Sequence, residues 1–258
     1  MGDEIKSDGA AGSGRVWQID ALRGVAMVLM TVFHALVDIR DFFAFADVRY
    51  YEPPLVFIGR SSAILFMFVS GISCRFSKNN VRRGAKVLLC GMAVTAATYF
   101  GFALFFGSSE LYIRFGILHF LGSAMIITGL FDSLVKNEKT RQIAMWIASP
   151  ASLIAGRAFS QLRAGTPLLL IFGIAPAGFV SYDYYPIFPW IGIFFAGYAI
   201  GRIVVNNRQR LAAMKKSGAA SAFCSLGRIS LVYYLLHQPA LIAVFFAFDF
   251  LFRVALNL

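Results

Sequence analysis

The sequence predicts an all-α fold: a polytopic membrane helical bundle of about seven spans with one short re-entrant or interfacial segment. Of the 258 residues, 59% are hydrophobic and only 14% are charged, which is unusual for a water-soluble domain. The apolar residues are gathered into runs of about 20 residues, the length that a helix needs to cross the hydrocarbon core of a bilayer. These two observations indicate an integral membrane protein.

Positive charge dominates the chain, with 24 Lys+Arg against 13 Asp+Glu and a formal net charge of +11. Such an excess is typical of proteins that bind nucleic acid and of membrane proteins whose basic loops face the cytoplasm. Because of the apolar runs, we expect membrane lipid, and no nucleic acid, as a partner. Cys74, Cys90 and Cys224 show no CxxC spacing, so neither a disulfide framework nor a zinc site is predicted, and no metal is expected.

Seven apolar runs are the expected membrane-spanning helices. They cover residues 21–38, 55–73, 85–106, 114–131, 143–159, 186–205 and 226–252. Glycine and proline interrupt a shorter run at 167–180, which we expect to be re-entrant or interfacial. Residues 1–16 are polar and rich in glycine, which predicts a disordered cytoplasmic tail, and residues 17–258 are expected to form one transmembrane domain without an internal repeat.

The orientation follows from the loops, because lysine and arginine prefer the cytoplasm. Basic clusters occupy residues 75–86, 136–141 and 202–216. All three share one side only if residues 160–185 stay on the outer side, whereas a full span at 167–180 would place the third cluster outside. We therefore expect the N-terminus in the cytoplasm and the C-terminus on the outer side.

The first apolar run carries four ionisable residues, Asp20, Arg23, His34 and Asp38, each of which a bilayer core penalises. At about 100° per residue they fall on one narrow stripe of the helix, and such a stripe should face protein or trapped water. Nearby carboxylates could fix the tautomer of His34 and suit it to act as a general base, which favours a functional role. Asp20 and Arg23 alone could instead mark the start of the helix at the cytoplasmic interface.

The other two histidines, His119 and His237, also lie inside apolar runs. His119 is expected near the outer end of the fourth run. His237 is expected near the middle of the last run, on a face shared with Ser230, Tyr233 and Tyr234, and is followed by Gln238. Each histidine could take part in catalysis or simply hydrogen-bond to a neighbouring helix.

Arg114 opens the fourth run on the outer side, where the preference of basic residues for the cytoplasm does not explain it. It could hold an anionic or hydroxylated acceptor, or pair with Asp38 or Asp183. Asp183 belongs to the stretch SYDYYPIFPW at 181–190, which suits either a sugar-contacting rim or an aromatic interface belt. On the cytoplasmic side, Arg82 and Arg83 follow from topology and could also bind the phosphates of a nucleotide-bearing cofactor.

Five stretches, taken in order, resemble the bacterial relatives of the heparan-alpha-glucosaminide N-acetyltransferase catalytic-domain family. They are IDALRGVAMVLMTVFH (19–34), LFMFVSGIS (65–73), RFGILHFLG (114–122), DYYPIFPWIGIFFAGYAIGR (183–202) and GRISLVYYLLHQP (227–239). The spacing from Arg23 to His34 is also similar to that in the first helix of the acyltransferase-three sugar O-acetylases. Both families belong to a wider group of transmembrane acyltransferases.

The resemblance implies transfer of an acyl group, usually acetyl from cytoplasmic acetyl-CoA, to an amine or hydroxyl of a sugar or glycan on the outer side of a bacterial inner membrane. His34 would be the general base, oriented by Asp38 or Asp20. The residues expected in catalysis are His34, Asp38, His119 and His237. The residues expected to bind acyl-CoA or the acceptor are Asp20, Arg23, Arg82, Arg83, Arg114, Asp183, Tyr234 and Gln238.

Residues 39–54 contain no histidine, whereas the lysosomal members of the family carry one in this loop. Their proposed acetyl-histidine chemistry is therefore not transferred to that loop. Two other classes of function stay open: a proton-coupled transporter or flippase that uses the same His, Asp and Arg groups as a relay, and a non-catalytic membrane partner. The sequence also leaves the oligomeric state open, a homo-oligomer included.

Overall fold

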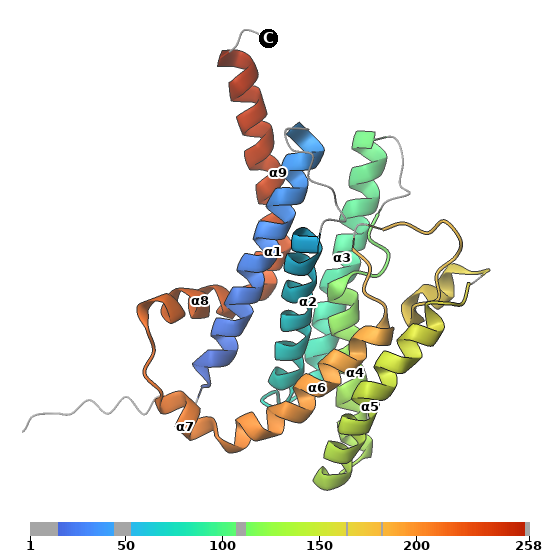
Figure 1. The fold of residues 1–258 in the computed structure, drawn as a ribbon, viewed down its shortest axis with the longest axis vertical. Helices are drawn as coiled ribbons and strands as arrows, with labels where there is room; N and C mark the ends of the chain where they lie inside the picture. Colours follow the sequence, from blue (N-terminus) through green and yellow to red (C-terminus); the bar gives the residue numbers. More distant parts are fainter. Residues whose placement is uncertain (1–14, 44–52, 107–111, 164, 182, 256–258) are drawn as a thin grey trace, which may run out of the picture.

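The computed structural model describes residues 15–43, 53–106, 112–163, 165–181 and 183–255, and over these residues the fold is a helical bundle (Figure 1). The helices are α1 (Trp17–Phe43), α2 (Pro53–Cys74), α3 (Asn80–Phe106), α4 (Ile117–Leu134), α5 (Glu138–Phe159), η1 (Pro167–Phe172), α6 (Ile187–Asn206), α7 (Arg208–Ala213), α8 (Gly218–Arg228) and α9 (Ser230–Ala255). The predicted all-α class is confirmed. The predicted disordered tail covers residues 1–16, of which 1–14 lie outside the described residues. Of the two described residues, Arg15 pairs with Asp20 and Val16 is buried.

Within the described part of the chain, six helices are long and apolar enough to cross a membrane: α1, α2, α3, α4, α6 and α9. Each overlaps a predicted span, and the polytopic membrane bundle is confirmed. The remaining predicted span, 143–159, is the fifth in the chain; it is present as α5 but is not among the six helices. Its polar content explains the difference, because α5 begins with Glu138 and Arg141 and carries Arg157 in its last turn.

The segment at 167–180 does not form a full span. Its only helical part is η1, six residues of 3₁₀ helix that end at Gly173 with a φ of 99°. At about 2.0 Å per residue, such a helix covers roughly 12 Å, far less than a bilayer core. The hydroxyl of Tyr184 donates to the carbonyl oxygen of Leu170 at 2.7 Å and ties η1 to the loop before α6.

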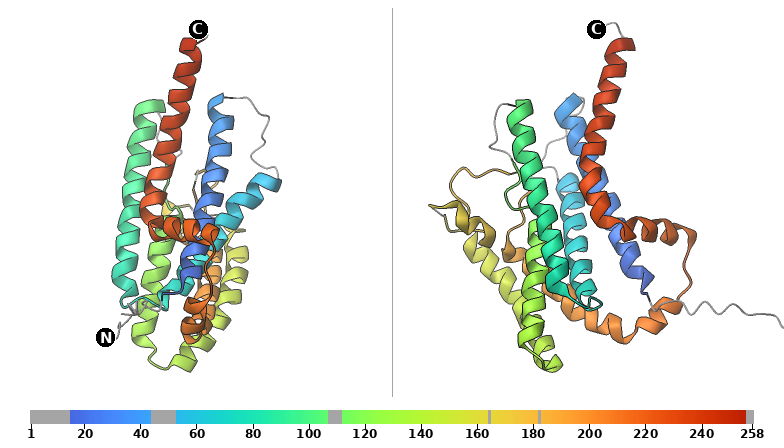
Figure 2. Two further views of the ribbon diagram at one scale, coloured as in Figure 1. Left: turned by 90° about the vertical axis from the view of Figure 1, so that its left-hand side faces the viewer. Right: turned by 180° about the vertical axis from the view of Figure 1, so that it is seen from behind.

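The three basic clusters lie at one end of the bundle, at the bottom of Figure 1. We call this end, formed by residues 75–86, 136–141 and 202–216, the basic end, and the opposite end the far end. Gathering these clusters at one end is what the predicted topology requires. α8 runs roughly perpendicular to α9 and crosses the first part of α1 (Figure 2).

Glycines allow two pairs of helices to approach closely. A Cβ atom on Gly71 of α2 would lie 2.1 Å from the carbonyl oxygen of Phe194, and one on Gly197 of α6 would lie 2.0 Å from that of Phe68. Contact between α1 and α8 depends on Gly24 and Gly227 in the same way. Small residues at such crossings let backbones pack directly, as is common in membrane bundles.

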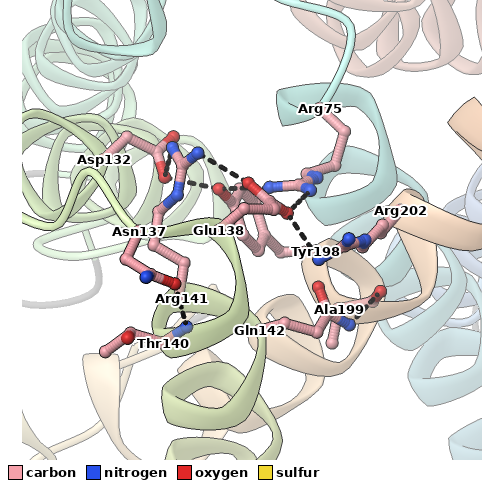
Figure 3. A network of polar contacts seen from close by, with 10 residues as sticks. All are labelled: Arg75, Asp132, Asn137, Glu138, Thr140, Arg141, Gln142, Tyr198, Ala199 and Arg202. Carbon is pink, nitrogen blue, oxygen red and sulfur yellow. Dashed lines mark hydrogen bonds and ion pairs between the residues drawn. The ribbon is translucent and has the colours of Figure 1, made fainter.

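At the basic end, an ion-pair network joins α4, α5 and α6 to the end of α2 (Figure 3). It comprises Arg75, Asp132, Glu138, Arg141, Tyr198 and Arg202. Glu138 is its centre, with ion pairs to Arg75, to Arg141 at 2.6 Å and to Arg202 at 3.3 Å. Burial acts to raise the pKa of Glu138, but the hydrogen bond from Arg75 and the nearby arginine charges hold it below its ordinary value. The network therefore attaches the polar helix α5 to the rest of the bundle.

Candidate active site

His34 of α1 and His237 of α9 form a hydrogen-bonded pair although they are 203 residues apart in the chain. Nδ1 of His34 lies 3.0 Å from Nε2 of His237, and the ring centroids are 5.0 Å apart. Nδ1 of His237 lies 2.6 Å from the carbonyl oxygen of Tyr234, one turn earlier on α9. His237 is buried and His34 is half-buried. Two of the predicted catalytic residues therefore meet in one place.

Further polar contacts hold α1 and α9 in register on either side of the pair. Below it, the hydroxyl groups of Thr31 and Tyr233 are 2.7 Å apart. Above it, Nε2 of Gln238 donates to both carboxylate oxygens of Asp38, at 2.9 and 3.0 Å. The second half of the α1 stripe thus faces α9, as expected for ionisable groups that avoid lipid.

The structure gives His34 a different partner from the carboxylate suggested by the sequence. Asp38 is hydrogen-bonded to Gln238, and Asp20 lies fourteen residues before His34, about 21 Å along the helix. Asp20 instead accepts from Arg15 at 2.7 Å and from Arg23 at 3.2 Å. The prediction that Asp20 orients His34 is therefore wrong, because one helix keeps the two residues at opposite ends.

His119 lies apart from the pair, in the first turn of α4 against α3. Its Nδ1 accepts from the backbone N–H of Gly116 at 3.2 Å, and its Nε2 lies 3.1 Å from Oγ1 of Thr95. Both ring nitrogens are therefore engaged, and the side chain is only 3% exposed. Within the described residues, no hydrogen bond links His119 to His34 or His237.

Asp183 connects the start of α4 to α9. Its Oδ2 accepts from the backbone N–H of Ile117 at 3.0 Å and from the hydroxyl of Tyr234 at 3.3 Å. A carboxylate at a helix N-terminus is favourable because the first N–H groups of the helix lack intrahelical partners. Burial nevertheless raises the pKa of Asp183 to about 6, while the bonds from Ile117 and Tyr234 act in the opposite direction. Asp183 therefore contacts Tyr234, which lies one helical turn before His237 on α9.

Arg114 lies just before α4, and among the described residues it is paired with neither Asp38 nor Asp183. Its guanidinium lies over the ring of Tyr112 at 5.0 Å and over that of Phe179 at 5.3 Å. Its Nε is buried without a hydrogen-bond partner. Stacking on aromatic faces stabilises the cation without neutralising its charge.

Arg82 and Arg83 line an open pocket of about 350 Å³ at the basic end, together with Asn79 and Lys86. Three cations and no acid line this pocket, which suits it to phosphate groups. The guanidinium of Arg83 also donates to the carbonyl oxygen of Ser73 at 3.4 Å. Arg23 of α1 donates to Oγ of that same serine, so Arg23 lies behind the pocket.

Some contributors to these sites were not among the predicted site residues, although Tyr233 was expected on the same helix face as His237. Thr31 and Tyr233 brace the histidine pair, and Asn79 and Lys86 complete the basic pocket. Thr31 could have been found, because it precedes His34 by three residues and so falls on the same helical stripe. Lys86 gives no such signal, since basic residues are expected in any cytoplasmic loop, and Asn79 is a neutral residue of the same loop region.

Comparison with known proteins gives one match. A family model described as "Heparan-alpha-glucosaminide N-acetyltransferase, catalytic" matches residues 15–239. This range includes the histidine pair, His119, Asp183 and the basic pocket, and the resemblance noted in the sequence is confirmed. No curated protein and no solved structure matches the chain.

Proposed function

This chain belongs to the heparan-alpha-glucosaminide N-acetyltransferase catalytic family, and from that premise we propose that it transfers an acetyl group from acetyl-CoA to an amine or hydroxyl of a sugar or glycan. Six helices suited to crossing a membrane support an integral membrane enzyme. We assign the basic end to the cytoplasm of a bacterial cell, where CoA is available, because basic loops favour that side. The acceptor then approaches from the far end.

The hydrogen-bonded pair of His34 and His237 carries this proposal. Histidine is the side chain most often used as a general base. In the proposed step, His34 takes the proton of the attacking amine or hydroxyl while that nitrogen or oxygen bonds to the thioester carbonyl carbon. The carbon–sulfur bond then breaks, and the sulfur leaves as the thiol of CoA with the proton from His34. The products are the acetylated acceptor and free CoA, and His34 returns to its neutral form.

The basic pocket would hold the donor. Arg82, Arg83 and Lys86 offer three cations to the phosphates of acetyl-CoA, and Arg23 adds a fourth behind them. Arg23 and His34 are eleven residues apart on α1, about 16 Å along its axis. The acyl arm of the donor would therefore run beside α1 from the pocket toward the histidine pair.

The other predicted site residues would shape the acceptor side. Asp183 and Tyr234 join the start of α4 to α9 next to the histidine pair. His119 stabilises the same helix start by accepting a hydrogen bond from the backbone N–H of Gly116. The charge of Arg114 would attract an anionic or hydroxylated part of the acceptor. Asp38 and Gln238 would keep α1 and α9 in register around the reacting groups.

Donor binding can be measured by calorimetric titration of acetyl-CoA and of free CoA into the purified full-length protein. We expect saturable binding, and the double substitution Arg82→Ala/Arg83→Ala should weaken it at least about tenfold, since each lost charge-assisted bond to phosphate contributes about 1.5–3 kcal/mol. Arg208→Ala/Arg210→Ala is the matched control, because both residues are exposed at the same end but outside the pocket. Equal losses in the two variants would contradict a specific donor pocket.

Turnover tests the role of His34. With acetyl-CoA and a glucosamine-terminated oligosaccharide as probes, His34→Gln should lower kcat by about 10²–10⁴-fold, the usual contribution of a general base, while binding of acetyl-CoA persists. Retained turnover in this variant would refute the assigned role. If folded wild-type protein binds neither acetyl-CoA nor CoA, but vesicles containing it take up solute in response to acid, a proton-coupled transporter replaces the acetyltransferase.

A further inference from the structure

The hydrogen bonds of the histidine pair fix the position of each ring hydrogen. A carbonyl oxygen only accepts, so Nδ1 of His237 donates to the carbonyl oxygen of Tyr234 and carries the hydrogen. A neutral imidazole has one N–H, which makes Nε2 of His237 an acceptor. Nδ1 of His34 lies 3.0 Å from that nitrogen and must therefore donate to it. Neutral His34 is thus protonated on Nδ1 and unprotonated on Nε2.

Nε2 of His34 remains available to a reacting group. Among the described residues, no hydrogen bond engages this nitrogen. The side chain of His34 is half-buried, so the described residues do not enclose it completely. The lone pair on Nε2 is therefore the one that the histidine pair leaves unused.

We propose that His237 is a positioning residue that holds His34 in the Nδ1–H tautomer, so that Nε2 of His34 is the basic nitrogen presented to the acceptor. The backbone of α9 sets the tautomers of both histidines, because the carbonyl oxygen of Tyr234 can only accept a hydrogen bond. The catalytic consequence rests on the proposed function, since it concerns the proton that His34 accepts. The tautomeric order itself depends only on the hydrogen bonds.

His119 provides an internal contrast. The backbone N–H of Gly116 can only donate, so Nδ1 of His119 accepts and its hydrogen is on Nε2, facing Oγ1 of Thr95. The same molecule is therefore expected to contain two histidines in the Nδ1–H form and one in the Nε2–H form. These are all the histidines of the chain.

Nitrogen-15 NMR of the full-length protein, labelled at its histidine side chains and held at a pH where imidazole is neutral, tests the order directly. We expect pyrrole-type Nδ1 and pyridine-type Nε2 signals for His34 and His237, and the reverse for His119. His34→Gln, His119→Gln and His237→Phe each remove one pair of signals and assign the spectrum. A pyridine-type Nδ1 on His34 in the wild-type protein would overturn the proposal.

Two substitutions of His237 test whether this residue causes the Nδ1–H form of His34. His237→Phe removes the acceptor, so the signals of His34 should move toward a mixture of tautomers. His237→Gln offers a side-chain carbonyl oxygen near the same place and should preserve the Nδ1–H form. An unchanged His34 spectrum in His237→Phe would overturn the positioning role. If His237→Phe does not fold, His237→Gln decides instead. Loss of the Nδ1–H form of His34 in that variant would overturn the positioning role.

Kinetics then separate this inference from the proposed function. In the acetyl-transfer assay, His237→Phe should lower kcat by about 10²-fold with little change in the KM for acetyl-CoA, and His237→Gln should recover most of the loss. Ordered tautomers in a protein that never transfers acetyl would refute the proposed function alone. Acetyl transfer by a protein whose His34 tautomers are mixed would refute this inference alone.

Discussion

Asp183 shows how one carboxyl can serve both a helix end and a neighbouring helix. Its bonds from Ile117 and Tyr234 favour the charged form, yet burial keeps its pKa at about 6. Between its ordinary pKa of 3.8 and about 6, the folded protein binds a proton here that the unfolded chain releases. The contribution of Asp183 to stability is therefore largest at low pH and falls as the pH rises through this window.

Removing the hydroxyl of Tyr234 should shift this balance. Tyr234→Phe deletes a bond that favours the carboxylate, so the pKa of Asp183 should rise by about one pH unit. Titration of the carbon-13 carboxyl signals measures the shift, and Asp183→Asn identifies the signal. Tyr233→Phe is the matched control, because the hydroxyl of Tyr233 lies against Thr31. A lowered pKa in Tyr234→Phe would contradict the described contact.

The sequence identified the individual residues of the site better than their partners. His34, His237 and Asp183 each stood out as polar residues in or beside apolar runs, where their cost to the fold requires a reason. The bond between His34 and His237 was not predictable, because a single sequence does not say which helices lie side by side. Asp38 and Asp20 were therefore considered as partners of His34 from their position on α1 alone.

Among the secondary structure elements, α2 and α6 are held together by two reciprocal glycine contacts, Gly71 with Phe194 and Gly197 with Phe68. Gly197→Ala should destabilise the protein by about 2 kcal/mol or more, because the new methyl group would overlap a backbone oxygen that cannot turn away. Thermal unfolding in detergent measures this effect.

Gly101→Ala in α3 is the control for that substitution. A Cβ atom there would meet nothing within 4 Å, so the better helix propensity of alanine should stabilise the protein by roughly 0.5–1 kcal/mol. Equal effects of the two substitutions would show that the α2–α6 contact is looser than described.

Apolar periodicity located the helices more reliably than it located their breaks. The run 226–252 was predicted as one span, but the structure ends α8 at Arg228 and begins α9 at Ser230. The junction residue, Ile229, is neither glycine nor proline, and the nearby Gly227 lies inside α8, so the residue at the turn does not mark it. The change of direction comes from contact between α8 and α1, a tertiary effect that periodicity does not record.

At the scale of the whole molecule, the proposed orientation places residues 160–185 outside the cell and the basic end inside. Gln209→Cys in α7 and Arg163→Cys before η1 test this in a chain whose three native cysteines are replaced, since both positions are exposed. A membrane-impermeant maleimide should label Arg163→Cys in intact cells and Gln209→Cys only after permeabilisation. The proposed orientation requires one crossing, by α6, between these two positions. Labelling of both from one side would mean that the segment between them crosses the membrane an even number of times, which would contradict it.

The continuity of α1 has a consequence for the whole reaction. Arg23, beside the basic pocket, and His34, in the histidine pair, are carried by one unbroken helix. The helix therefore fixes both the distance and the angle between these two side chains. Inserting a single residue between them would lengthen their separation by about 1.5 Å and turn one side chain by about 100° relative to the other. Under the proposed function, the number of residues between Arg23 and His34 therefore sets the length of donor that fits between the basic pocket and the histidine pair.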